Sequence, residues 1–154
     1  MRYLLLDCIT EIKYGSYAKG IKCVTLSEDY LEQHFPLYPV YPGALTIESL
    51  AQLSGWLINL SLRQNNRPHF FALLTKVDRM KFTHIVTPGD RLELYSTLEG
   101  IQETGAYVNV EAKVGDKVSA SGSLMFFLTK LETEQENAVN AYARVFTRNM
   151  KVVE

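Results

Sequence analysis

A histidine and a glutamate fourteen residues apart are the side chains whose placement points to chemistry. His34 stands in the loop QHFPLYPVYPG, which has three prolines in residues 36–42. Proline fixes φ and interrupts both helix and sheet, so this loop should be stiff. Glu48 is the one charged residue between Ala44 and Leu62. The sequence therefore places a titratable base on a stiff loop and a lone acid in an apolar segment.

These groups suit an acid–base reaction. A neutral imidazole is a base near neutral pH, and burial among apolar side chains disfavours the charged form of a carboxyl group. Such contrasting environments assign base and acid roles to two titratable groups. Gly43 is expected to open a helix, where its N–H lacks an intrahelical partner and suits a developing oxyanion. Together these groups predict proton abstraction beside a carbonyl and loss of a leaving group, an α,β-elimination.

Each of these residues also has a purely structural explanation. A lone histidine before Phe-Pro is more often a loop or packing residue. Gln52 lies four residues after Glu48, on the same helix face, and is expected to hydrogen-bond to it. That bond either supports a catalytic carboxyl group or simply satisfies a buried one.

The helix that positions Glu48 is predicted over about residues 43–64. Its apolar residues point in all directions, which is typical of a helix enclosed by other structure, and Pro68 prevents its continuation. A membrane span is disfavoured, because Glu48, Gln52 and Asn59 would be costly inside a bilayer.

Extended segments surround this helix in the sequence. Apolar alternation and turn residues predict strands at 3–6, 9–14, 17–26, 70–74, 77–82, 92–98, 106–114 and 118–128, with 70–82 as one long strand or a bent pair. A short helix is expected after Ser27. The fold class is therefore α+β, an antiparallel sheet of about five to seven strands. One sheet buries such a helix only by curling around it, which is the hotdog arrangement.

The C-terminal residues differ in character. Residues 132–154 begin with an acidic, polar stretch and continue with apolar residues at helical spacing, which predicts an amphipathic helix over about 133–149. We therefore expect a hotdog domain at 1–131 and a helical tail at 132–154. The tail either docks on its own subunit or a dimer partner, or else binds another protein or stays disordered.

Composition restricts the class of partner. The 154 residues are 47% hydrophobic and carry a net charge of −1, which gives no electrostatic case for nucleic acid or anionic membrane. Cys8 and Cys23 form no disulfide framework or CxxC motif. The N-terminal apolar run of three leucines is too short for a signal peptide, so we expect a cytoplasmic protein.

The stretch HFPLYPVYPGALTIESLAQ closely resembles the HFPGxPxxPGxxxxExxAQ signature of 3-hydroxyacyl-(acyl-carrier-protein) dehydratases of the FabZ type. The segments LLLDCITEI and FALLTKVDRMKFTHIVTPGDRLEL are also similar to that family. The resemblance implies that His34 acts on the C2 proton, Glu48 helps the 3-hydroxyl leave as water, and Gly43 N–H polarises the thioester carbonyl.

The resemblance also implies the context of the reaction. It implies no metal and no organic cofactor, with acyl carrier protein as the substrate-bearing partner. It implies a homodimer, often assembled further into hexamers, in which the His and Glu of one site come from different subunits. The acyl chain would lie in an apolar tunnel between the subunits.

This sequence departs from the signature at one position. Leu37 replaces the usual glycine, which can take backbone angles that leucine resists. Tyr38 and Tyr41 add bulk to the same loop, and Trp56 is expected in the core or along the acyl tunnel. A specialised lipid or polyene-like pathway is therefore one hypothesis. A hotdog thioesterase and a non-catalytic acyl-binding subunit are the alternatives, and no role is assigned to His69 or His84.

Overall fold

Seven strands form one sheet within residues 3–68 and 70–154, the part of the chain that the computed structural model describes. The strands are β1 (Cys8–Lys13), β2 (Tyr17–Cys23), β3 (Phe70–Phe82), β4 (Arg91–Ile101), β5 (Gly105–Val114), β6 (Lys117–Lys130) and β7 (Lys151–Val152). Their order is β3-β6-β5-β4-β2-β1-β7, and all neighbours are antiparallel except β7, which runs parallel to β1.

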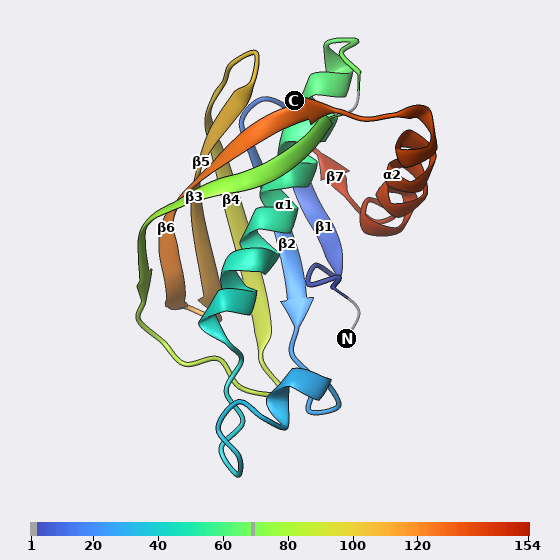
Figure 1. Cartoon of the computed structure of the whole chain (residues 1–154). Coiled ribbons are helices and arrows are strands. Elements are labelled where there is room, and N and C mark those ends of the chain that lie inside the picture. The colour runs from blue at the N-terminus through green and yellow to red at the C-terminus, as the bar shows by residue number, and fades with distance from the viewer. Residues whose placement is uncertain (1–2, 69) are drawn as a thin grey trace.

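A single long helix, α1 (Gly43–Gln64), lies in the concave side of this sheet. Figure 1 shows β3 and β6 curling away from the other strands and passing in front of α1. The helix bounds confirm the predicted range of about 43–64, and the sheet confirms the predicted hotdog fold.

Alternation along the strands explains why the sheet closes on the helix. On β5, residues 106, 108, 110 and 112 are buried, so every second side chain faces inward. The inward residues of β4 include Leu92 and Leu94. They meet fully buried leucines of α1 such as Leu53 and Leu57 in one continuous core.

Three buried serines of α1 find hydrogen-bond partners within the helix. Ser49, Ser54 and Ser61 each donate a hydrogen bond to the carbonyl four residues earlier, at 2.6–2.8 Å. The sequence predicted that α1 is buried on all sides, which is wrong for one side of the helix. Glu48 and Gln52 lie on this half-exposed side, because the sheet covers only part of the helix surface.

Two local predictions were wrong. Residues 3–6 form no strand, because backbone groups of Tyr3 and Leu5 bond to the side chain of Gln52. The short helix expected after Ser27 is a single 3-10 turn, η1 (Asp29–Leu31), which begins without a side-chain cap. Residues 24–42 otherwise form a loop that extends beyond the N-terminal end of α1 (Figure 1).

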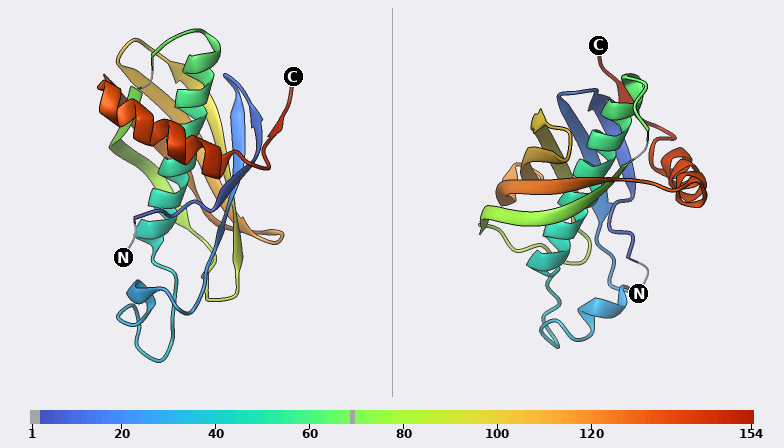
Figure 2. Two further views of the ribbon diagram at one scale, coloured as in Figure 1. Left: turned by 90° about the vertical axis from the view of Figure 1, so that its right-hand side faces the viewer. Right: turned by 45° about the horizontal axis from the view of Figure 1, so that its top comes forward.

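The C-terminal residues contain the expected helix, α2 (Thr133–Phe146), which ends earlier than the predicted residue 149. The chain then turns so that Lys151 and Val152 pair with β1, a strand that the sequence did not predict. Figure 2 shows α2 lying across α1, and the rings of Phe146 and Trp56 are 5.5 Å apart. The tail thus packs on its own subunit, while the division at residue 131 stays a prediction.

Among the residues described, no helix is long and apolar enough to cross a membrane.

The close approach of β2 to α1 gives a test of the fold. A Cβ at Gly20 would lie 3.0 Å from Leu53 Cδ1 of α1 and 3.0 Å from the backbone oxygen of Cys8. Because a backbone oxygen cannot move aside, Gly20→Ala should destabilise the protein by about 1–3 kcal/mol. Urea unfolding at one fixed protein concentration measures this change.

Gly55→Ala is the matched control for that substitution. A Cβ at Gly55 meets only Ala72 Cβ, at 3.9 Å, and alanine favours a helix interior by about 1 kcal/mol over glycine. This variant should unfold at the same or higher urea concentration. Equal unfolding midpoints for Gly20→Ala and the unaltered protein would contradict the tight packing of β2 on α1.

Candidate active site

The tautomer of the neutral His34 ring follows from its hydrogen bond. His34 Nδ1 lies 2.7 Å from the backbone oxygen of Val40. A carbonyl oxygen only accepts, so Nδ1 carries the proton and the neutral ring keeps its lone pair on Nε2. The side chain is half-buried, beside the ring of Phe35 at a centroid distance of 4.5 Å. His34 is thereby oriented as an Nε2 base.

The loop that holds His34 contains two residues in left-handed conformation. Phe35 has φ of 59° and Leu37 has φ of 70°. Leucine at such a φ costs about 1–2 kcal/mol, which explains why glycine suits this position. The side chains of Leu37 and Tyr38 point outward, and that of Leu37 is fully exposed at 103%. Neither side chain fills the interior of its own subunit.

Tyr41 anchors the loop to the rest of the molecule. Its N–H donates to the Val86 oxygen at 2.8 Å, and its hydroxyl lies 3.0 Å from the Ser49 hydroxyl on α1. Burial raises the pKa of Tyr41 to about 12, so its hydroxyl keeps its proton at neutral pH. Tyr41 is thus a buried anchor that also borders a pocket, whereas the sequence suggested only added bulk.

A buried ion pair supports the loop from its other side. Lys22 is 5% exposed, and its Nζ lies 2.7 Å from Glu28 Oε1. The Tyr30 hydroxyl donates to the second oxygen of Glu28, and its ring packs edge-on against Tyr41 at 5.7 Å. Burial first, and then the Glu28 bond, raise the pKa of Tyr30. The sequence did not predict this cluster of Lys22, Glu28 and Tyr30, because its alternation places Lys22 on the outward side of a half-buried strand.

Gly43 begins α1 at the edge of a pocket of about 280 Å³. The helix has no side-chain cap, and its first amide bonds within the turn come from Leu45 and Thr46 to the Pro42 oxygen. The Gly43 N–H precedes this turn, as an oxyanion donor must. Phe82 packs so closely that a Cβ at Gly43 would lie 2.9 Å from its ring.

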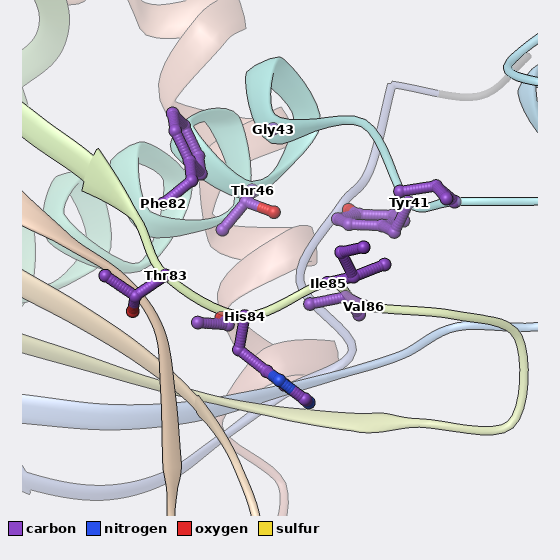
Figure 3. A pocket seen from close by; sticks show the side chains of 10 residues that line it. Tyr41, Gly43, Thr46, Phe82, Thr83, His84, Ile85 and Val86 are labelled. Atoms are coloured by element: carbon purple, nitrogen blue, oxygen red, sulfur yellow. The ribbon is translucent and has the colours of Figure 1, made fainter.

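Figure 3 shows this pocket between the start of α1 and the segment that follows β3. Thr46 and Phe82 lie on the helix side, and His84 borders the pocket although the sequence gave it no role. The His84 ring is directed away from Gly43 and Thr46 (Figure 3). His69 lies outside the described residues.

Gln52 holds the carboxyl group of Glu48 in place. Its side-chain oxygen accepts from Leu5 N–H at 2.9 Å, and its NH₂ group donates to the Tyr3 oxygen and to Glu48 Oε1, each at 3.0 Å. Every donor of this amide is therefore used, which fixes its orientation. Burial and the nearby Glu48 raise the pKa of Tyr3, as expected for a phenol close to the carboxyl group.

Glu48 lines a different pocket from the one that Gly43 borders. This second pocket, of about 440 Å³, is lined by Glu48, Gln52 and Trp56 of α1 and by apolar residues of β3, β6 and α2. Trp56 thus borders this pocket. The sequence predicted it either in the core or along the acyl tunnel, and its place along a tunnel stays a prediction.

The structure does not bring His34 and Glu48 into one hollow of one chain. His34 borders a shallow pocket with Tyr30 and Pro42, which shares no lining residue with the pocket at Glu48. Glu48 follows Gly43 by five positions, so the two residues face directions about 140° apart around the helix. Within residues 3–68 and 70–154, no three His, Cys, Asp or Glu side chains gather as metal ligands would.

Comparison with known sequences identifies relatives along most of the chain. Residues 1–123 match the FabA-like domain. The chain is 38% identical over 128 residues to the 3-hydroxyacyl-(acyl-carrier-protein) dehydratase FabZ of Thermoanaerobacter sp. strain X514, covering 83% of this chain and 88% of that one. It is 36% identical over 123 residues to FabZ of Legionella pneumophila strain Lens, covering 80% and 82% of the two chains.

Solved structures share the fold at lower identity. The dehydratase heterocomplex ApeI:P from Xenorhabdus doucetiae aligns with a TM-score of 0.71 at 18% identity, covering 90% of this chain and 95% of that one. A hypothetical thioesterase with coenzyme A from Streptococcus pneumoniae TIGR4 aligns at 0.60 and 13%, covering 81% and 87%. These likenesses concern the fold, whereas the sequence match over residues 1–123 shows that the chain belongs to the FabA-like family of hotdog proteins.

Proposed function

We propose that this protein dehydrates 3-hydroxyacyl-(acyl-carrier-protein) to the trans-2-enoyl thioester, in fatty-acid or related lipid biosynthesis. The observation that carries the proposal is the orientation of His34, whose Nδ1–H is held by the Val40 oxygen so that Nε2 is free to take a proton. This histidine lies in a family match whose FabZ relatives bear the name of that reaction.

The groups described account for each atom of an elimination. His34 Nε2 takes the proton from C2 while the Gly43 N–H stabilises negative charge on the thioester oxygen. Glu48 donates a proton to the 3-hydroxyl, which leaves as water as the C2–C3 double bond forms. Gln52 holds the carboxyl group by its bond to Glu48 Oε1. Proton return from His34 to Glu48, through solvent, completes the cycle.

Two subunits supply one site in this proposal. His34 and Glu48 of one chain face different hollows, so each requires a second copy to complete it. β3 is the last strand at its end of the sheet and exposes Phe71, Leu73 and Val77. A long apolar edge strand of this kind is normally covered. In a symmetric dimer, the β3 edge of each copy covers the β3 edge of the other. Homodimer formation is therefore part of the proposal.

The remaining context stays predicted. Acyl carrier protein as the substrate-bearing partner, further assembly into hexamers and a cytoplasmic location all follow from the family and the sequence. No metal or organic cofactor enters the proposed reaction, because a histidine base, a carboxylic acid and an amide donor supply all its proton transfers.

The roles of His34 and Glu48 can be tested by substitution. His34→Ala and Glu48→Gln should each lower the dehydration rate by about 10²–10⁴-fold, the usual contribution of a general base or acid. The reverse reaction gives a direct measurement, since hydration of an enoyl thioester removes its absorbance. Glu103→Gln, at an exposed turn outside these pockets, is the control and should keep the rate. Near-normal rates in both of the first two variants would rule out these roles.

Mixing the two inactive variants tests whether sites are shared between subunits. With random pairing, half of the dimers are mixed, and each mixed dimer holds one complete site, so activity should return to about a quarter of normal. The variants are co-expressed with different tags to verify mixing. No recovery in verified mixed dimers would place both groups in a site within one chain.

Leu37→Gly tests whether the departure from the signature obstructs the site. Because Leu37 is exposed and its φ suits glycine, the substitution should change the rate by less than about threefold and should not lower stability. Activity and thermal unfolding are measured together. An increase of more than about tenfold would mean that Leu37 obstructs the substrate, which would favour the acyl-binding alternative.

A further inference from the structure

The helix α2 forms a wall of the pocket beside Glu48. Val139, Tyr142 and Phe146 fall at spacings of three and four residues, so they share one side of the helix. All three line the same hollow of about 440 Å³ as Glu48 and Trp56. Phe146 is buried, with its ring 5.5 Å from Trp56 and stacked at 6.3 Å on Tyr142.

Both ends of this wall are fastened to the hotdog core. At its start, Glu132 and Gln135 form a capping box directly after β6. At its end, β7 pairs with β1, and the Val153 N–H donates to the Ile12 oxygen at 2.8 Å. Figure 2 shows α2 held across α1 between these two attachments. A helix held in this way is a fixed boundary of the pocket.

The wall is an addition to the part of the chain that the family model matches. That match ends at residue 123, whereas α2 begins at Thr133. Apart from Phe126 of β6, the rest of the pocket belongs to the matched part, including Glu48 and the start of β3. The size and shape of this hollow therefore depend on a segment beyond the matched region.

The proposed reaction indicates which part of the substrate fills the hollow at Glu48. If Glu48 protonates the departing 3-hydroxyl, then C3 lies beside its carboxyl group, and C4 and the carbons beyond must continue along an adjacent apolar surface. The hollow at Glu48 offers such a surface, with Trp56, Phe70, Phe71, Phe126, Tyr142 and Phe146 among its lining residues. Its volume lies within the range of about 300–1,000 Å³ that is usual for small-molecule pockets.

We propose that α2 closes the acyl-chain pocket and limits the length of the 3-hydroxyacyl chain that the protein accepts, with Val139 and Tyr142 as specificity-determining residues. This inference rests on the proposed function, because it takes Glu48 as the acid. Tyr142 is 46% exposed and lies at the outer boundary of the hollow, whereas Phe146 is needed for packing.

The test uses 3-hydroxyacyl carrier-protein thioesters from butyryl to tetradecanoyl, with kcat/KM measured for each. Tyr142→Ala should raise the ratio of long-chain to short-chain kcat/KM by about tenfold, since the pocket gains room for further methylene groups. Val139→Trp should lower the same ratio, because the larger side chain shortens the pocket. Val145→Ala, at an exposed position of α2 outside the pocket lining, is the matched control and should leave the ratio unchanged.

The outcomes separate this inference from the proposed function. If the unaltered protein turns over no chain length, the proposed function fails. If it is active and folded Tyr142→Ala and Val139→Trp keep its chain-length profile, then α2 is not the limiting wall. If these variants instead weaken dimer formation with an unchanged profile, the hollow holds the second subunit and the inference is overturned. Should Val139→Trp fail to fold, Val139→Ala replaces it; this smaller side chain enlarges the pocket and should raise the ratio of long-chain to short-chain kcat/KM.

Discussion

The structure depends on the burial of one face of α1 by the curled sheet. Leu50, Leu53, Leu57 and Ile58 are fully buried there, against inward residues of β4, β5 and β6. Burying a side chain of this size contributes about 1.5–3 kcal/mol, and the contributions of one helix face add up along its length. This burial fixes the rotation of α1, and so decides where Gly43 and Glu48 point. The two groups are placed by the same packing although they face different hollows.

The site is supported through hydrogen bonds to backbone groups rather than through direct pairing of the two candidate catalytic side chains. His34 is oriented by the Val40 oxygen, and Glu48 by Gln52, whose amide is in turn held by Tyr3 and Leu5. Backbone groups cannot rotate freely, so they fix a side chain more rigidly than another side chain does. The N-terminal segment thereby supports Glu48, the proposed acid, and the proline-rich loop supports His34, the proposed base.

The tail adds to this arrangement without altering the core. β7 extends the sheet at the edge beside β1, and α2 borders the hollow at Glu48. A chain can change such a peripheral wall without disturbing the proposed catalytic groups, which lie on α1 and its preceding loop. This separation offers a physical route to different substrate ranges on one hotdog core.

The sequence by itself determined much of this protein. Proline spacing, a lone glutamate and helical periodicity were enough to predict α1 and its bounds, because these signals are local in the chain. The pairing of His34 with Glu48 in a reaction stays a prediction. Tertiary structure decided the rest. Residues 3–6 have a strand-like pattern but bond to Gln52, and β7 forms only because α2 returns the chain to β1. Whether two groups share a hollow depends on the rotation of α1 and on contacts between distant segments. Local sequence patterns carry no record of either. The family resemblance implied that the His34 and Glu48 of one site come from different subunits, and the folded chain places the two residues in separate hollows.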